Sequence, residues 1–201
     1  MVTMTAQKIE PKTEPMIDLP EDGIITRSAF EALPQVPRGW AWELCSGRLE
    51  LTYMPVTGWH WLVVLAALEY WRDRGHAVLG EQYVADSGFA RHMSGKHNFV
   101  ADGVAFKPGY KPHPRASTHG AANLIAVIEA VSEDSEERDA VRKRAVYAQL
   151  GVPNYWIIRE ASPNADDEDG LISMYELTDG EYKLAGKRLV SQLKDADEVE
   201  E

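Results

Sequence analysis

One stretch of the sequence constrains the fold more than any other. Residues 124–131, LIAVIEAV, form a continuous apolar run that only Glu129 interrupts. Such a run is typical of a strand that is covered on both faces of a sheet. The next residues carry helix signals up to Gly151 and Pro153, and NYWIIRE at 154–160 predicts a second strand. A strand, a helix and a strand within about 35 residues indicate a βαβ crossover with parallel strands.

Periodicity and turn residues predict the other elements of the chain. We expect a first hairpin that turns at Ser46-Gly47 and a last one that turns at 178–180. An apolar helix that Thr57 caps and Gly75 closes is expected to be largely buried. The predicted ranges are a short helix within 26–37 with a Ser28–Glu31 capping box, the first hairpin over 40–55, the apolar helix over 57–75, strands over 76–85 and 97–108, the crossover helix capped by Ser132 or Ser135, and the last hairpin over 171–186.

The 201 residues are enough for one domain with extended ends. Residues 1–22 are polar and aperiodic, so we expect a flexible N-terminal arm. The predicted domain covers 23–190, and an acidic tail follows over 191–201. The net charge of −11 is concentrated in both ends and in 160–169, so the domain itself is close to neutral. A local basic surface for nucleic acid therefore remains compatible with the sequence.

Cysteine usage and hydropathy indicate the compartment. Cys45 is the only cysteine, which excludes an internal disulfide and fits a reducing environment. We interpret it as a small core residue rather than a nucleophile. The longest apolar run, at 61–68, is too short to cross a bilayer, and we find no signal peptide. We therefore expect a cytoplasmic protein that is not bound to a membrane.

Two acids interrupt apolar strands. Glu129 shares a predicted strand face with Val127 and Val131, and Asp102 alternates with three apolar residues in FVADGVAF. An isolated buried carboxylate is costly unless it is paired, protonated or bound to a cation. Two such acids on neighbouring strands suggest a shared cation, and Mg²⁺ prefers carboxylates with water and phosphate oxygens. The alternative is two structural acids, each bonded to backbone or paired with arginine.

The helix after Glu129 supplies a cation. Asp139, Lys143 and Tyr147 have i, i+4, i+8 spacing and therefore share one helix face. Asp139 and Lys143 could be only a surface ion pair, worth a few tenths of a kcal/mol. Alternatively, Lys143 could reach back over the end of the Glu129 strand and hold a water or a phosphate oxygen.

These residues resemble the Uma-two-type restriction endonucleases, a branch of the PD-(D/E)XK nuclease superfamily. Members carry a Pro-Asp strand, an apolar strand with Glu and a following Ser, an Asp-x-x-x-Lys helix with Tyr, a Gly-Val-Pro turn and a Tyr-Trp strand. The resemblance spans about residues 25–190 and is most specific over 124–158. The matching residues are Asp102, Glu129, Ser132, Asp139, Lys143, Tyr147, 151–153 and Tyr155-Trp156, with Glu43, Gly47 and His60 further upstream.

Two positions depart from the family pattern. Ala101 stands in place of the Pro of the Pro-Asp pair, where only the Asp side chain would reach a metal. Val131 stands where the superfamily has its (D/E)XK lysine. The resemblance implies that the helix supplies this lysine, and Lys143 is the matching position.

The resemblance implies an α/β domain of the restriction-endonuclease-like fold, with a central mixed β-sheet flanked by helices. It also implies Mg²⁺-dependent hydrolysis of DNA phosphodiester bonds, with Mn²⁺ as an alternative ion. Asp102, Glu129 and Lys143 would be catalytic. Asp102 and Glu129 would hold the metal, with Glu43 as a further ligand, and Lys143 would orient the attacking water. The supporting residues would be His60, which could contact phosphate or hold Glu43, together with Ser132, Asp139 and Tyr147.

A loop between the two acidic strands carries Lys107, Lys111 and Arg115. These cations could contact the nucleic-acid backbone, or the loop could simply be solvated. The rival to an active nuclease is a nuclease-fold module that binds nucleic acid or protein without cutting. A third alternative is an interaction protein with structural acids only. A homodimer would suit the cutting of both strands, and the sequence has no lipase, P-loop, Rossmann or zinc-protease motif.

Overall fold

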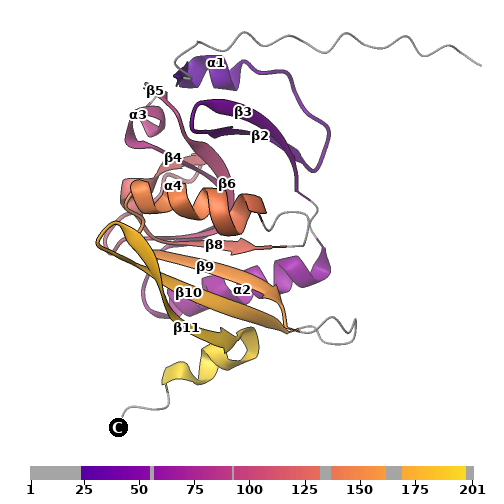
Figure 1. The fold of residues 1–201 in the computed structure, drawn as a ribbon, viewed down its shortest axis with the longest axis vertical. Coiled ribbons are helices and arrows are strands. Elements are labelled where there is room, and N and C mark those ends of the chain that lie inside the picture. Colours follow the sequence, from indigo (N-terminus) through magenta and orange to yellow (C-terminus); the bar gives the residue numbers. More distant parts are fainter. Residues whose placement is uncertain (1–23, 55–56, 92, 132–136, 162–168, 198–201) are drawn as a thin grey trace, which may run out of the picture.

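The computed structural model describes residues 24–54, 57–91, 93–131, 137–161 and 169–197. Among these residues, nine strands form one mixed sheet in the order β11-β10-β9-β8-β6-β2-β3, with β4 beside β6 and β7 beside β4 (Figure 1). A second, two-stranded sheet pairs β1 with β5. The strands are β1 Ile25–Thr26, β2 Trp40–Cys45, β3 Arg48–Tyr53, β4 Val78–Ala85, β5 Ser94–Gly95, β6 Asn98–Phe106, β7 Thr118–Gly120, β8 Leu124–Ala130, β9 Asn154–Glu160, β10 Gly170–Thr178 and β11 Glu181–Leu189.

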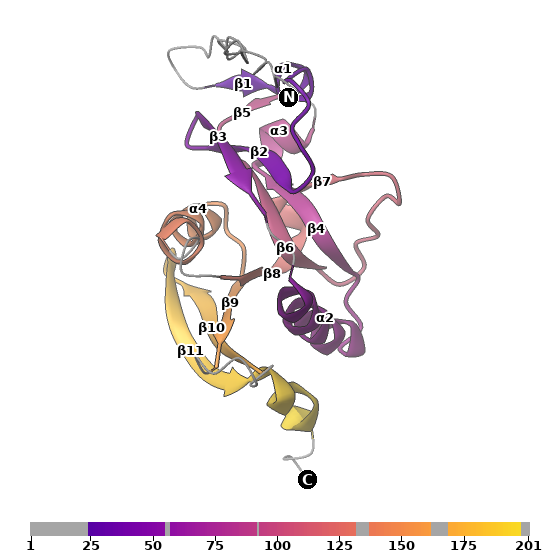
Figure 2. The same ribbon diagram turned by 90° about the vertical axis from the view of Figure 1, so that its right-hand side faces the viewer.

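Helices lie on both faces of the main sheet. Figure 2 shows α4 on one side of β8 and β9 and α2 on the other. The helices are α1 Arg27–Glu31, α2 Gly58–Asp73, α3 Ser87–Ala90, a 3-10 turn Ala121–Asn123, a π-helical segment Glu137–Lys143 that continues into α4 Arg144–Gln149, and a 3-10 helix Val190–Asp197. This arrangement confirms the predicted fold class. No helix among the described residues is long and apolar enough to cross a membrane.

The predicted crossover is present. β8 pairs with β9 in parallel, from Ala126↔Asn154 to Ala130↔Ile158, and the π-helical segment and α4 lie between them in the chain. β6 pairs with β8 in antiparallel, so the strands that carry Asp102 and Glu129 are neighbours, as the sequence indicated. The first and last hairpins turn at the predicted residues, Ser46-Gly47 and Asp179-Gly180, all of which have positive φ. This conformation matches the twist of a tight hairpin.

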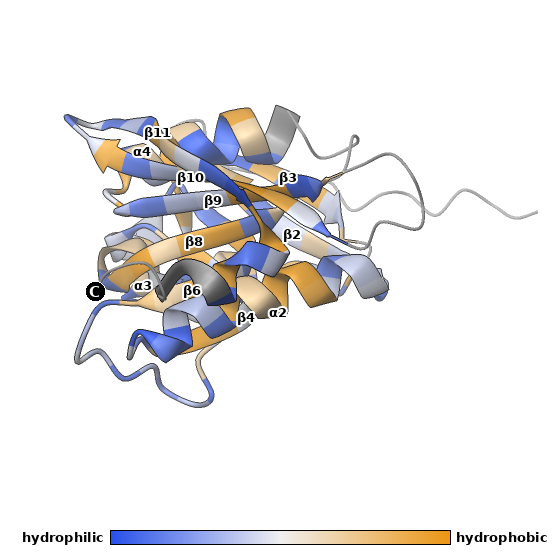
Figure 3. Ribbon diagram, turned by 90° about the horizontal axis from the view of Figure 1, so that it is seen from below, coloured by the Kyte–Doolittle hydropathy of each residue, from blue (hydrophilic) through white to orange (hydrophobic). Residues whose placement is uncertain are grey.

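The composition of β8 follows from its central place in the sheet. Val127 packs in the cluster that includes Tyr147 of α4, whereas Ala126 and Ile128 pack in the cluster that includes the buried face of α2. β8 appears in Figure 3 as a largely hydrophobic strand through the middle of the sheet. Both of its faces are therefore covered, which explains the uninterrupted apolar run.

Helix α2 begins where the sequence predicted but is less buried than expected. The Thr57 side chain accepts a hydrogen bond from the backbone N–H of His60, and Gly75 follows the helix with φ 84°. One face of α2 packs on the sheet, but Trp61 and Leu62 are 48% and 51% exposed. The expectation of a largely buried helix was wrong because the apolar residues extend beyond the buried face.

Three local predictions differ from the structure. Thr26, not Ser28, caps α1, because its hydroxyl accepts the N–H of Ala29. Residues 190–197, most of which were expected to belong to the acidic tail, form a 3-10 helix whose Leu193 is buried against the α2 side of the sheet. The segment before α4 is π-helical rather than α-helical. The predicted caps Ser132 and Ser135 and the predicted N-terminal arm, residues 1–22, lie outside the described residues.

Candidate active site

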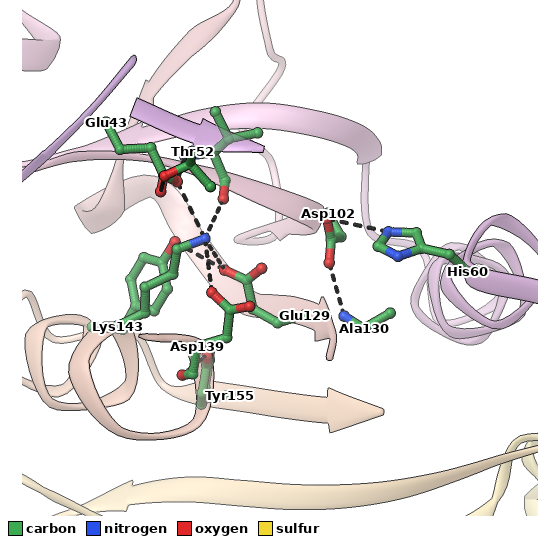
Figure 4. Close-up of polar contacts among 11 residues, drawn as sticks. Glu43, Thr52, His60, Asp102, Glu129, Ala130, Asp139, Lys143 and Tyr155 are labelled. Carbon is green, nitrogen blue, oxygen red and sulfur yellow. Dashed lines mark hydrogen bonds and ion pairs between the residues drawn. The ribbon is translucent and has the colours of Figure 1, made fainter. Parts of the chain in front are cut away.

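A buried lysine lies among three carboxylates (Figure 4). The Lys143 ammonium donates to the carbonyl oxygen of Val100 at 2.7 Å. Its Nζ also lies 3.2 Å from Oε1 of Glu43, 3.3 Å from Oε1 of Glu129 and 3.3 Å from Oδ1 of Asp139. Lys143 therefore points into the protein and not to solvent, and the Asp139–Lys143 pair is buried rather than a surface pair.

The first hairpin fixes Glu43 in this cluster. Glu43 is on β2, and the neighbouring strands supply hydrogen bonds to both of its carboxylate oxygens. The Thr52 hydroxyl of β3 donates to Oε2 at 2.8 Å, and the Val100 N–H of β6 donates to Oε1 at 2.8 Å. These donors stabilise the charged carboxylate at a position that is 2% exposed. Whether Glu43 is a further metal ligand stays a prediction.

Glu129 projects from β8 toward α4. Its Oε1 accepts the Lys143 ammonium and, at 3.4 Å, the Tyr147 hydroxyl. Burial raises the pKa of Glu129 well above its usual range. The Lys143 charge opposes this rise, and the charges of Asp102, Asp139 and Glu43 add to it. Three carboxylates, from Glu43, Glu129 and Asp139, therefore lie around one ammonium.

The π-helical segment carries both Asp139 and Lys143, and their side chains form an ion pair. Asp139 is 3% exposed, and its carbonyl oxygen accepts a hydrogen bond of 2.6 Å from the Tyr155 hydroxyl of β9. This hydrogen bond connects the π-helical turn to β9, the strand that runs parallel to β8. The i, i+4 spacing that the sequence indicated is therefore an ion pair inside the protein.

Asp102 lies opposite Glu129 on the neighbouring strand. The β6–β8 register pairs Gly103 with Ile128, so the next position along both strands places Asp102 across from Glu129. The Oδ2 of Asp102 accepts the Ala130 N–H at 2.8 Å, and Oδ1 lies 3.2 Å from Nε2 of His60. The two acids are adjacent, although their side chains face different partners in Figure 4.

His60 and Asp102 have the most exposed side chains of the site. Its side chain is 20% exposed and that of Asp102 is 11% exposed, whereas the side chains of Lys143, Glu43 and Glu129 are 4%, 2% and 2% exposed. Burial lowers the pKa of His60, but the hydrogen bond and charge of Asp102, with more distant acids, outweigh it and raise the pKa overall.

The structure does not bring all predicted residues together. His60 contacts Asp102 and not Glu43, so the idea that it holds Glu43 was wrong; Figure 4 shows the two side chains apart. Lys107, Lys111 and Arg115 lie on the loop between β6, which carries Asp102 at its centre, and β7. Their role as backbone contacts stays a prediction, and Ser132 lies outside the described residues.

Glu81 of β4 also lies beside the site, and our interpretation of the sequence missed it. The pairs Gly80↔Gly103 and Gln82↔Ala101 place Glu81 opposite Asp102. Its backbone has φ 46°, in the left-handed region that costs a non-glycine residue about 1–3 kcal/mol. Its charge also contributes to the raised pKa of His60. A single polar residue in a half-buried strand is ordinary, so the sequence carried no signal for it.

The donor set fits a hard cation held by few protein ligands. Among the residues that the structure describes, no group of three or more His, Cys, Asp or Glu side chains is arranged to hold a metal ion. Mg²⁺ often takes only one or two carboxylates and completes its shell with water and phosphate oxygens. Asp102 and Glu129, opposite each other on neighbouring strands, are two such carboxylates.

Comparisons with known proteins show the family and the fold of the chain. A family model described as "Putative restriction endonuclease", Uma2 (the Uma-two type), matches residues 27–198. A crystal structure of "a putative nuclease belonging to DUF820" from Anabaena variabilis ATCC 29413 is similar with a TM-score of 0.56 and 17% identity, over 82% of this chain and 83% of that one. At this identity the likeness shows a shared fold. No curated protein matches the chain.

Proposed function

The chain belongs to the Uma2 family, and on that premise we propose that it is a Mg²⁺-dependent endonuclease that hydrolyses phosphodiester bonds of DNA. The observation that carries the proposal is the convergence of Glu129 and Lys143 in one buried cluster, with Asp102 on the adjacent strand position. Several buried carboxylates beside one lysine suit a cation better than a sugar cleft or a nucleophile.

Asp102 and Glu129 would hold the metal ion. Bound there, Mg²⁺ would polarise the scissile phosphate and lower the pKa of an attacking water. Asp102 is kept in place by the Ala130 N–H, and the Lys143 and Tyr147 donors orient Glu129. Such fixed hydrogen bonds hold the two acids in position before substrate arrives, which avoids reorganisation during the reaction.

Lys143 and His60 would supply positive charge. Lys143 would orient the attacking water and offset the negative charge that develops on phosphate. The side chain of His60 is 20% exposed, and the Asp102 carboxylate raises the pKa of its ring, so His60 could contact a phosphate oxygen. The loop with Lys107, Lys111 and Arg115 would add contacts to the nucleic-acid backbone further away.

The test is cleavage of supercoiled plasmid DNA in Mg²⁺ or Mn²⁺. We expect nicked and linear products from the wild-type protein, no products in EDTA, and losses of at least about 100-fold in Asp102→Asn and Glu129→Gln. Asp73→Asn and Glu176→Gln are matched controls, because both residues are exposed and remote in the fold, and they should cleave like wild type. Equal cleavage in all five proteins would contradict the proposal, and a parallel RNA substrate tests the DNA preference.

The second candidate is a nuclease-fold module that binds nucleic acid without cutting it. One observation favours it: protein donors already engage both oxygens of Glu43 and both of Asp102. A wild-type protein that leaves DNA intact in both metal ions but binds it with strong salt dependence would support this candidate.

A further inference from the structure

A pocket of about 250 Å³ lies at the end of the molecule that holds α1, α3 and β2 (Figures 1 and 2). Its lining comes from α1 and the segment after it, from β2, β4 and α3, and from the start of β7. Five of the lining side chains are aromatic: Phe30, Trp40, Trp42, Tyr83 and Phe89. Aromatic rings are the surfaces on which proteins stack unpaired bases, because every base has a flat π-face.

Contacts within the protein fix several of these rings. Phe30 packs edge-on against Tyr83 and Phe89, with ring centroids 6.0 Å and 5.4 Å apart. The Trp42 indole N–H donates to the Pro34 carbonyl at 2.8 Å. A ring that is already held in place loses little conformational freedom when a ligand packs on it.

Trp40 is the most exposed of the lining rings. It is 40% exposed, and its ring centroid lies 5.1 Å from that of Tyr53, which is itself 52% exposed. Core packing does not explain two large aromatic side chains in solvent. They offer an open stacking surface beside the fixed rings.

The polar part of the pocket joins it to the basic loop between β6 and β7. Ser117 and Thr118 line the pocket, and the Ser117 carbonyl accepts the Tyr83 N–H at 2.8 Å, which fixes this end of the loop. Arg115 stands two residues before Ser117, and both Arg115 and Lys111 are exposed. A base in the pocket thus has hydroxyl groups available to its edge and cations near its flanking phosphates.

The pocket and the candidate active site share two strands. Trp42 lines the pocket, and the next residue of β2 is Glu43 of the buried cluster. On β4, Tyr83 lines the pocket, and Glu81, two residues earlier, lies opposite Asp102. The same strands therefore position both sites.

We propose that this pocket binds one unpaired base of a nucleic-acid strand, while the neighbouring phosphates contact the loop at Lys111 and Arg115. The inference rests on the proposed function in one respect, that nucleic acid is the ligand. Stacking is tolerant of base identity, so the pocket selects DNA with an unpaired base over fully paired DNA without reading a sequence.

The test compares two fluorescein-labelled duplexes of equal length, one fully paired and one with a single unpaired base. Fluorescence anisotropy in EDTA measures their binding apart from metal-dependent cleavage. We expect wild type to bind the duplex with the unpaired base about 10-fold more tightly. Trp40→Ala, which removes a stacking ring, and Ser117→Leu, which fills the pocket, should lose this preference and bind the paired duplex as wild type does.

Two controls should keep the preference: Trp40→Phe, which retains a ring, and Leu184→Ala, at an exposed position on β11. Ser117 is exposed, so Ser117→Leu tests the pocket even if Trp40→Ala fails to fold. Equal affinity of wild type for both duplexes, or a preference that survives Ser117→Leu, would overturn the inference.

A nucleoside monophosphate distinguishes a free nucleotide from a base on a strand. It should compete only weakly, because it lacks the flanking phosphates. Competition as strong as that of unlabelled duplex with the unpaired base would assign the pocket to a free nucleotide and overturn the inference. Plasmid cleavage tests the proposed function separately, since a protein can cleave without this preference or show the preference without cleaving.

Discussion

Glu129 shows how a carboxylate is accommodated in a buried strand. The sequence predicted that Glu129 is buried, that Asp102 lies on a neighbouring strand and that Lys143 shares a helix face with Asp139. Each prediction follows from residue periodicity. The resemblance implied Glu43 as a further ligand at the site, but the sequence did not predict its ion pair with Lys143 or its hydrogen bond from Thr52. Those contacts depend on how the first hairpin packs against β6, which is a tertiary property that no local pattern encodes.

The raised pKa of Glu129 predicts a pH-dependent stability of the metal-free protein. Between the ordinary glutamate pKa and the raised native value, the folded protein holds a proton that the unfolded chain has released. Stability therefore falls as pH rises through this window. Glu129→Gln removes this group, so we expect a flatter dependence than wild type in urea unfolding from about pH 5 to 8 in EDTA.

The control is Glu176→Gln, an exposed glutamate on β10 that should leave the slope unchanged. Parallel slopes for wild type and Glu129→Gln would mean that Glu129 has the same proton affinity in the folded and unfolded chains.

At the element scale, the π-helical segment is the part that the sequence could not predict. The i, i+4 spacing of Asp139 and Lys143 indicated a shared face correctly. The wider turn depends instead on an interaction with another element, the hydrogen bond from the Tyr155 hydroxyl of β9 to the Asp139 carbonyl. Such π-helical turns occur often at functional sites.

Tyr155→Phe tests what that hydrogen bond contributes. The Tyr155 side chain is fully buried, so removing its hydroxyl leaves the Asp139 carbonyl without this donor inside the protein. We expect this change to destabilise the fold by about 1–2 kcal/mol. Tyr53→Phe is the matched control, because Tyr53 is 52% exposed, and its effect should stay within about 0.5 kcal/mol. Denaturant unfolding measures both, and equal effects would show that the hydrogen bond does not stabilise the segment.

At the scale of the whole molecule, the sequence predicted the crossover, both hairpins and the mixed α/β class. These features follow from apolar runs and turn residues close together in the chain. It did not predict that β4 lies beside β6 or that Leu193 packs against the sheet. Both depend on contacts between distant segments. The site shares this property, because its acids come from β2, β6, β8 and the π-helical segment.

The central claim is that Asp102 and Glu129 act as one metal-binding unit in DNA cleavage. The most direct test is a double-mutant cycle on the single-turnover cleavage rate in Mg²⁺, with wild type, Asp102→Asn, Glu129→Gln and the double variant. Residues that act as a unit are strongly non-additive, so the double variant should be about as slow as either single variant. A double variant whose rate loss equals the product of the two single losses would contradict the claim.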